Sequence, residues 1–218
     1  MDPIILYHFP FSPVSRAVLL TARSLDIELE IKEVNLIKRE NLEPWYLEIN
    51  PQHTVPVIND NGHILTESRA ISRYLVNSRA PGSSLYPEDP KLRSIVDQRL
   101  CFDEGTVFSR MAKVFENIKK GGTEITDEHI ESIYEVFKWL NDILSSSKWM
   151  AGDEITIADT TLLATLSTLF ELGAKLNDYP ELQRWFDQCK DELPGFEENA
   201  KAVEEIANVI KSKLTKGF

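Results

Sequence analysis

Ser12 and Pro13 are the first residues whose types and spacing suggest chemistry, and they follow the turn-rich segment His8-Phe9-Pro10-Phe11. A serine at the N-cap with a proline at the first helical position is a strong signal for the start of a helix. Free backbone N–H groups and the positive end of the helix dipole favour an anion there. Ser12 is therefore a candidate for stabilising a thiolate, although capping a helix would by itself explain a serine at this position.

Two further segments combine groups that could hold a peptide-like ligand. In Thr54-Val55-Pro56-Val57 the proline removes a ladder donor, which suggests an ordinary turn, an edge position or a cis bond. An edge strand can pair with the backbone of a peptide ligand. Glu67, Ser68 and Arg69 begin a predicted helix, where they could hold the charged ends of an amino acid or form a cap with solvated charges. His53 is a lone loop histidine, a residue that usually has no special role.

The apolar pattern predicts the elements that must position these residues. Strands, helices and a hairpin follow one another in the order strand 4–7, helix 14–25, strand 27–34, short helix 42–49, hairpin strands 54–58 and 63–65, and helix 67–78. The strand at 27–34 alternates polar and apolar residues, which indicates a half-buried strand. This βαβ-ββα order is typical of a thioredoxin-like domain.

A stretch rich in proline, glycine and serine over residues 78–90 indicates a domain boundary. We therefore expect a thioredoxin-like domain at 1–80, a linker at 81–90 and an all-helical domain at 91–218. Apolar residues recur with helical period over 100–118, 130–144, 158–172 and 182–193. Thr156-Ile157-Ala158-Asp159 matches the capping-box pattern, so Asp159 is expected to serve folding and not catalysis.

The formal charge of −11, from 24 Lys+Arg against 35 Asp+Glu, argues against nucleic-acid binding because such a chain repels phosphate backbones. A small anionic ligand would need local positive groups. No apolar run approaches the roughly 20 residues that span a bilayer, and no signal-peptide pattern is present, so we expect a cytoplasmic protein that does not associate with membranes. Cys101 and Cys189 belong to no metal-ligand pattern and are expected to be buried thiols, with no metal site.

Taken together, the segments 12–16, 50–56 and 66–71 resemble those of the cytosolic glutathione transferases, and the resemblance covers essentially the whole chain. The segments Asp97-Gln98-Arg99-Leu100 and 150–159 make it most similar to the insect delta and epsilon classes, with epsilon favoured. The resemblance implies an α/β plus all-α fold in which a thioredoxin-like domain precedes a helical bundle domain.

What the resemblance implies for the site is specific. Ser12 would donate a hydrogen bond to the thiolate of reduced glutathione, which would act as co-substrate with no tightly bound cofactor. His53 would meet the glycyl carboxylate, and Val55, before a cis Pro56, would pair with the cysteinyl residue. Thr54 would join these glutathione-binding residues, and the γ-glutamyl end would be held by Glu67, Ser68 and Arg69.

A hydrophobic electrophile would bind between the domains against the first long helix of the second domain, where the resemblance points to Phe9, Phe108, Met111, Phe115 and Glu116. These aromatic residues and the methionine could equally be core. The implied protein is a homodimer that conjugates small hydrophobic electrophiles in detoxification, with dehydrohalogenation or peroxide reduction as side activities. The alternative is a non-catalytic carrier of glutathione or hydrophobic ligands.

Two departures from the family pattern affect the site. Asn41 stands where relatives often have histidine, so a second imidazole contact to glutathione is expected to be missing. Ser15 stands where many relatives have cysteine, so neither redox position of a thioredoxin-like CxxC carries a thiol and disulfide exchange is excluded there. Tyr7 is a competing thiol donor, because other classes use a tyrosine at the end of the first strand. The Ser-Pro-x-x-Arg pattern favours Ser12.

Overall fold

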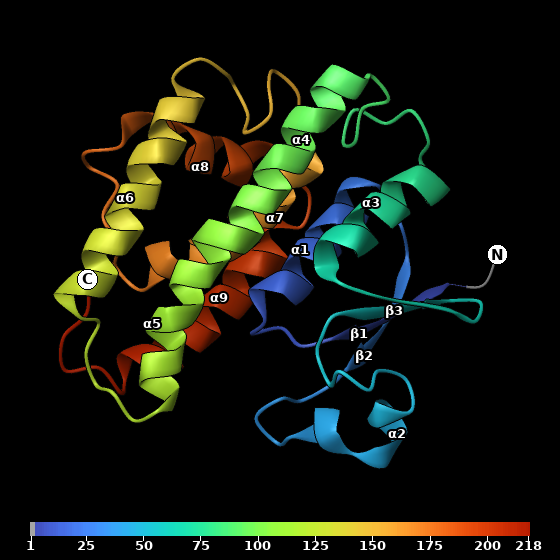
Figure 1. Cartoon of the computed structure of the whole chain (residues 1–218), viewed down its shortest axis with the longest axis horizontal. Coiled ribbons are helices and arrows are strands. Elements are labelled where there is room, and N and C mark those ends of the chain that lie inside the picture. Colours follow the sequence, from blue (N-terminus) through green and yellow to red (C-terminus); the bar gives the residue numbers. More distant parts are fainter. Residues whose placement is uncertain (1–2) are drawn as a thin grey trace.

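The computed structural model describes residues 3–218, in which a small sheet with its helices lies beside a larger group of helices (Figure 1). The strands are β1 (Ile4–His8), β2 (Leu29–Glu33), β3 (Val57–Asp60) and β4 (His63–Thr66). The helices are α1 (Pro13–Ser24), α2 (Pro44–Leu47), α3 (Ser68–Arg79), α4 (Pro90–Phe102), α5 (Ser109–Lys119), α6 (Asp127–Leu144), α7 (Ile157–Glu171), α8 (Pro180–Glu192) and α9 (Phe196–Lys211).

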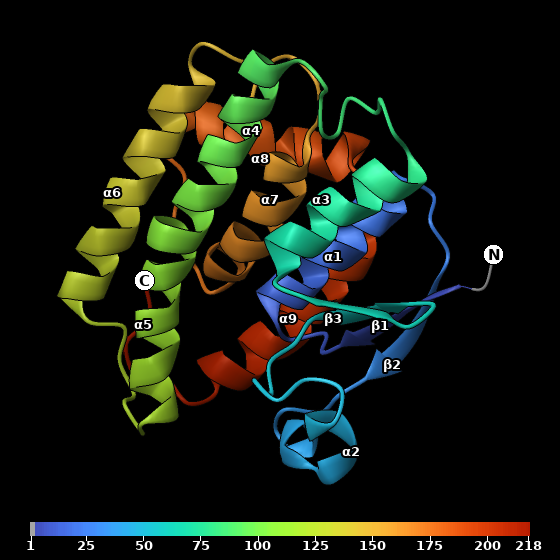
Figure 2. The ribbon, with the colours of Figure 1, turned by 45° about the vertical axis from the view of Figure 1, so that its right-hand side comes forward.

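The four strands form one mixed sheet in the order β2-β1-β3-β4, with β1 parallel to β2 and antiparallel to β3. The β3–β4 hairpin turns at Asn61 and Gly62, which have φ values of 51° and 92°. Two consecutive positive φ angles match the right-handed twist of a tight hairpin, which is why Asn-Gly is favoured there. Helices α1 and α3 cover one face of the sheet, and α2 lies on the other side (Figures 1 and 2). The expected thioredoxin-like fold is confirmed.

Some expected details are wrong for identifiable reasons. The segment expected to be one helix at 42–49 is a 3₁₀ turn, Glu40–Leu42, followed by the single-turn α2. Pro44 interrupts it, because proline disfavours helical backbone in the residue before it. β2 is an edge strand and mostly exposed, with Ile31 40% exposed. Cys101 is exposed as well, whereas Cys189 is buried as expected.

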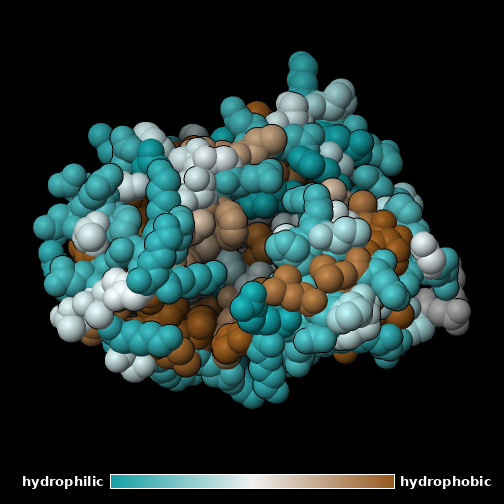
Figure 3. Space-filling view, turned by 60° about the horizontal axis from the view of Figure 1, so that its bottom comes forward, coloured by the Kyte–Doolittle hydropathy of each residue, from teal (hydrophilic) through white to brown (hydrophobic). Residues whose placement is uncertain are grey.

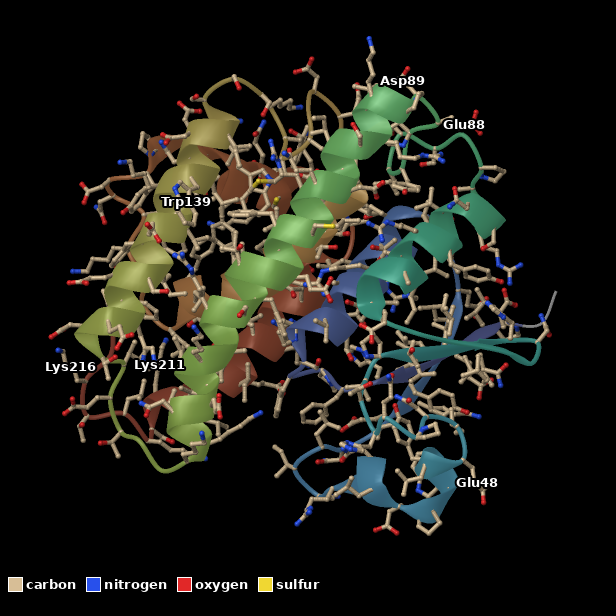
Figure 4. All side chains as sticks on the ribbon, in the orientation of Figure 1. Glu48, Glu88, Asp89, Trp139, Lys211 and Lys216 are labelled. Atoms are coloured by element: carbon tan, nitrogen blue, oxygen red, sulfur yellow. The ribbon has the colours of Figure 1, made fainter. Side chains whose placement is uncertain are left out.

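The helical domain begins with α4, whose first turn is capped by Asp89, labelled at the upper end of α4 in Figure 4. The Asp89 carboxylate accepts hydrogen bonds from the N–H groups of Lys91 and Leu92. Between α4 and α5 the chain forms a π-helical segment, Asp103–Phe108. No helix within residues 3–218 combines the length and apolar character needed to cross a bilayer. The domain limits at residues 80 and 91 remain predictions; α3 ends at Arg79 and α4 begins at Pro90.

Helix α1 packs against α7 and joins the two parts of the molecule (Figure 2). The Arg16 guanidinium, 2% exposed, donates to the carbonyl oxygens of Pro10 and Ala164, to the Thr168 hydroxyl and to the Asn199 amide oxygen. Burial lowers the pKa of Arg16 to about 9, so the group is a cation at neutral pH. A buried charge must be fully hydrogen-bonded to be tolerated, and Arg16 meets this requirement by linking α1, α7 and α9.

Asp159 at the start of α7 forms the expected capping box with Thr156. Its buried carboxylate accepts from the N–H groups of Met150 and Thr156, from the Thr156 hydroxyl and from the indole N–H of Trp185, at 2.9–3.0 Å. Burial raises the pKa of Asp159, and the hydrogen bonds from Met150, Thr156 and Trp185 act in the opposite direction. Its role in folding, predicted from the capping pattern, therefore extends to α8.

Replacing Asp159 with alanine should lower the free energy of unfolding by at least about 3 kcal/mol, because several buried donors would lose their acceptor. Urea denaturation followed by tryptophan fluorescence measures this. Asp153→Ala removes a nearby exposed carboxylate and is the matched control, with an expected change within about 0.5 kcal/mol. Equal stability of the two variants would contradict a structural role for Asp159.

Candidate functional site

Three segments that the sequence separates meet at one edge of the sheet. In the strand register Tyr7 pairs with Val57, and Val57 pairs with Thr66. Because β1 and β4 end at this edge and β3 begins there, the chain after β1, before β3 and after β4 must converge. These are the segments that contain Ser12, Val55 and Glu67–Arg69. The face brought forward in Figure 3 carries a hollow with hydrophobic side chains, between the helical part and the sheet part.

Ser12 is the N-cap of α1, with φ −85° and ψ 116°, and Pro13 occupies the first helical position. The loop is fixed by its own backbone, because the Ser12 N–H donates to the Phe9 carbonyl at 2.9 Å. The Ser12 side chain makes no capping hydrogen bond and is half-buried. Within residues 3–218 its hydroxyl is therefore available to a ligand at the positive end of the α1 dipole.

Ser15, one turn further along α1, is less accessible to a ligand than Ser12. Its hydroxyl is fully buried and has no hydrogen-bond partner among the described residues. Tyr7 is 6% exposed, and its ring contacts Tyr46 edge-on. Of these candidates only Ser12 combines a helix start with partial exposure.

The segment before β3 has backbone groups that are available for hydrogen bonds. The Val55–Pro56 peptide bond is cis, as the resemblance implies. Neither the N–H nor the carbonyl of Val55 has a backbone partner within residues 3–218, which leaves both groups able to pair with an extended ligand. The Thr54 carbonyl instead accepts from the Tyr46 hydroxyl at 2.6 Å and from the Asn50 amide at 2.9 Å, which hold the loop in place.

His53 is exposed in this loop and has a φ of 49°. The Asn41 side-chain amide donates to the His53 carbonyl at 2.8 Å. Asn41 therefore contributes to the loop that presents His53.

The segment after β4 begins α3, where Glu67 is the exposed N-cap residue and Ser68 and Arg69 are buried. The Arg69 guanidinium forms a buried ion pair with Asp103, the first residue of the π-helical segment. Burial raises the pKa of Asp103, and the charge and hydrogen bond of Arg69 act in the opposite direction. Arg69 Nε and Asp103 Oδ1 have no further partner in the described part of the chain.

Asp103 was missed by the sequence analysis. No periodic pattern marks a π-helical segment, and its partner Arg69 lies 34 positions earlier in the chain. Removing one member of a buried pair leaves the other charge uncompensated, which destabilises a protein by about 3–5 kcal/mol. Asp103 therefore fixes Arg69, and with it the start of α3.

The residues expected at the electrophile site lie in different environments. Phe108 is half-buried, and its ring lies 5.8 Å from the Arg69 guanidinium carbon, next to the polar edge. Phe115 is also half-buried, and Phe9 is 7% exposed with an edge-on contact to Phe11. Met111 is 1% exposed and belongs to the main core, as the alternative interpretation has it.

Glu116, the fifth of these residues, is exposed and pairs with Lys120 at 2.6 Å, which lowers its pKa. Within residues 3–218 no group of three or more His, Cys, Asp or Glu residues is arranged to hold a metal ion. The arrangement brings together a hydroxyl and backbone groups without protein partners, beside half-buried aromatic side chains.

The chain is a two-domain protein in which the polar edge of a thioredoxin-like domain lies beside an all-helical domain. Comparisons with known proteins identify its family. Residues 6–84 match the model of the glutathione S-transferase N-terminal domain, and residues 107–192 match that of the C-terminal domain. A relative from Drosophila melanogaster, glutathione S-transferase D7, is 37% identical over 94% of this chain and 92% of its own.

Solved structures agree. An epsilon-class glutathione S-transferase from the housefly, Musca domestica, is 35% identical with a TM-score of 0.92, covering 97% of this chain and 99% of its own. A glutathione transferase homologue from Drosophila mojavensis, solved with bound glutathione, is 33% identical with a TM-score of 0.93, covering 99% and 100%. The chain therefore belongs to the glutathione S-transferase family and is a transferase similar to the insect delta and epsilon classes.

His8 ends β1 four residues before Ser12, and its environment predicts a pH dependence of stability. The side chain is 4% exposed, and Nδ1 has no partner in the described structure. Burial, assisted by the charge of Arg16, lowers the pKa of His8 from 6.5 to about 4, while Glu198 acts in the opposite direction. The folded protein thus holds the imidazole neutral at pH values where the unfolded chain protonates it.

Because the unfolded chain binds a proton at His8 that the folded chain excludes, the free energy of unfolding is highest above pH 6.5. It falls as the pH falls towards 4, by about 3 kcal/mol in all. His8→Asn removes this titration, so the difference in unfolding free energy between the parent and this variant should change over that window. Urea denaturation at a series of pH values measures it. His63→Asn makes the same substitution at an exposed histidine on β4 and is the matched control. Parallel curves for the parent and His8→Asn would contradict the prediction.

Proposed function

We propose that Ser12 activates the thiol of reduced glutathione for attack on small hydrophobic electrophiles. The observation that carries the proposal is the convergence of Ser12, Val55 and the start of α3 at one edge of the sheet, which follows from the strand register. A hydroxyl donor and the positive end of α1 both favour the thiolate over the thiol. The bound thiol therefore has a lowered pKa and is more nucleophilic near neutral pH.

The remaining residues position the tripeptide. The free N–H and carbonyl of Val55 suit the cysteinyl backbone, and the exposed imidazole of His53 suits the glycyl carboxylate. Glu67 is exposed to meet the γ-glutamyl ammonium, while the Ser68 hydroxyl and Arg69 suit its carboxylate. Glutathione bound to the Drosophila mojavensis homologue supports this choice of ligand.

Conjugation joins the glutathione sulfur to an electrophilic carbon, and the leaving group departs where one is present. Phe108 beside Arg69 supports an apolar half-site adjoining the polar edge, with Phe9 and Phe115 as further candidates. Met111 lies in the core, so we expect it to shape this half-site through packing. Dehydrohalogenation and peroxide reduction are side activities that the same thiolate would support, and detoxification is typical of the family.

Ser12→Ala should lower kcat for conjugation of 1-chloro-2,4-dinitrobenzene by about 10- to 100-fold, because a hydrogen bond to a charged group contributes about 1.5–3 kcal/mol. KM for glutathione should change little. Thiolate absorbance at 240 nm, titrated against pH, should report a raised pKa of the bound thiol. The fold should be retained, since the Ser12 side chain makes no capping bond.

Two controls separate the possible donors. Ser15→Ala removes a buried, unpartnered hydroxyl and should leave the pKa of the bound thiol unchanged. Tyr7→Phe removes only a hydroxyl and should affect turnover far less than Ser12→Ala. A larger loss in Tyr7→Phe, with an unshifted thiol pKa in Ser12→Ala, would transfer the role of donor to Tyr7.

We also propose that the protein is a homodimer that associates through β4, α3 and α4. β4 is an edge strand, and apolar side chains are exposed on it and on α4, including Ile64, Leu92 and Ile95. Apolar groups gathered at neighbouring exposed elements are typical of an interface between copies. The ion pair of Arg73 with Asp97 joins α3 to α4 and holds this face together.

The double variant Leu92→Glu, Ile95→Glu should be a monomer in sedimentation velocity, because it places like charges opposite one another across a two-fold interface. The parent should sediment at twice the chain mass. Val209→Glu introduces a charge at an exposed apolar position of α9 and should remain dimeric. A parent protein that is monomeric at micromolar concentration, or a double variant that stays dimeric, would contradict this interface.

A further inference from the structure

A positive φ angle is uncommon for residues other than glycine, and residues 3–218 contain five instances. They are Asp26, Arg39, His53, Asn61 and Glu67. Asp26 follows the end of α1 and Asn61 forms the β3–β4 turn, two places where such backbone is expected. His53 and Glu67 belong to the proposed glutathione site. Arg39, with a φ of 62°, belongs to neither group.

Arg39 lies at the end of a tight turn that follows β2. Its N–H donates to the Leu36 carbonyl at 3.2 Å, and the Glu40 N–H donates to the Asn35 carbonyl at 3.1 Å, which is the bond pair of a Schellman motif. Glycine is usual at the position of Arg39, because a Cβ atom disfavours left-handed backbone. The Arg39 side chain is exposed and makes no hydrogen bond, ion pair or ring contact within residues 3–218. An unengaged side chain at a strained position points to a ligand.

The same turn lies against the loop that carries His53. The Leu42 N–H donates to the Arg39 carbonyl at 2.9 Å, so the chain between them forms one compact turn that contains Asn41. The Asn41 amide donates to the His53 carbonyl at 2.8 Å and joins this turn to the loop before β3. Both Arg39 and His53 are exposed. A ligand group that contacts the His53 imidazole is therefore within reach of the Arg39 guanidinium.

Within residues 3–80, Arg39 and Lys38 are the exposed lysine and arginine side chains that have no carboxylate partner. The others form ion pairs, except for the buried Arg16: Arg23 with Glu198, Lys32 with Glu30, Arg69 with Asp103, Arg73 with Asp97, and Arg79 with Asp60. Glu40 follows Arg39 but accepts a hydrogen bond from the Asn35 N–H at 2.8 Å. Because Glu40 and Glu43 offset the two cations at long range, an anion would be held here by direct contact with a guanidinium.

We propose that Arg39 binds the glycyl carboxylate of glutathione together with His53, and so sets a preference for thiols that end in a free carboxylate. This inference rests on glutathione as the substrate, as proposed above. A planar guanidinium can donate two parallel hydrogen bonds to one carboxylate. The Arg69 guanidinium is already paired with Asp103, which leaves Arg39 as the unpaired guanidinium nearest in the chain to His53.

Glutathione and its glycyl ethyl ester test the proposal, because they share the thiol and the γ-glutamyl end but only glutathione has the glycyl carboxylate. With excess 1-chloro-2,4-dinitrobenzene, Arg39→Gln in the full-length protein should raise KM for glutathione about two- to fivefold, the usual strength of one exposed ion pair. The kcat values and KM for the ester should stay near those of the parent. Equal changes in KM for the two thiols, or an unchanged KM for glutathione, would overturn the proposal.

Lys38→Gln removes the same charge from the neighbouring exposed position and is the matched control. The assays are run at about 0.15 M salt, where exposed charges more than about 8 Å apart are largely screened. The ratio of KM for the ester to KM for glutathione should then stay at the parent value in Lys38→Gln and fall in Arg39→Gln. Equal falls in the two variants would show that the charge of the turn alone is responsible and would refute a contact from Arg39.

Arg39→Gly separates a ligand contact from a role in folding. Glycine suits a φ of 62°, so the melting temperature of the ligand-free protein should rise by about 1–3 °C, while KM for glutathione rises as in Arg39→Gln. A lower melting temperature would show that the Arg39 side chain stabilises the turn and would overturn the inference. Such a result would leave the assignment of Ser12 intact, because the test of Ser12 reads kcat and the pKa of the bound thiol, whereas the tests of Arg39 read KM.

Discussion

The buried guanidinium of Arg16 is the interaction on which the rest of the structure depends. One side chain from α1 meets acceptors in the loop before it, in α7 and in α9, at 2.7–3.1 Å. At 2% exposure, a guanidinium without hydrogen-bond acceptors would lower the free energy of unfolding by more than the net stability of a domain. The four acceptors must therefore be in place together. The position of Arg16 therefore fixes how the start of α1 sits on the helical domain. Ser12 lies one helical turn before it.

Helix α7 is the common support for this arrangement. The Asp159 carboxylate holds its first turn and joins it to α8, and the Thr160 hydroxyl lies 2.9 Å from that of Thr21 on α1. The ion pair of Arg69 with Asp103 forms a second buried link between the sheet domain and the helices. The two parts of the proposed site, at the starts of α1 and α3, therefore depend on buried polar contacts. Packing alone would not fix the position of one part relative to the other.

Local patterns in the sequence were enough to predict the fold and several of the helix starts and turns that position the candidate site. Ser12 and Pro13 mark a helix start by their chemistry, Asn61 and Gly62 mark a hairpin, and Thr156 with Asp159 marks a capping box. Each of these signals acts within four residues, so it can be read without the tertiary structure.

What could not be predicted depends on contacts between distant segments. In the sequence Arg16 is only one residue of a motif, because its acceptors on α7 and α9 lie far along the chain. Asp103 carries no signal in the sequence, because its role depends on its contact with Arg69. Met111 and Phe108 share a helical pattern, yet one is core and the other lies beside the guanidinium. Cys101 and Ile31 are exposed because no neighbouring element within residues 3–218 covers them, a fact that periodicity cannot supply.

Electrostatics explains why such a site needs its polar contacts so closely arranged. The chain carries a charge of −11, and glutathione is itself an anion that gains a further negative charge when its thiol is ionised, so long-range forces oppose binding. Arg69 is a buried cation at this edge, but Asp103 neutralises much of its charge. Most other favourable groups of the proposed site are dipoles: the backbone of Val55, the hydroxyls of Ser12 and Ser68, and the N–H groups at the starts of α1 and α3. Dipoles act over short distances, so the thiolate stabilisation that we propose would be sensitive to the position of Ser12, and that position is held by Arg16.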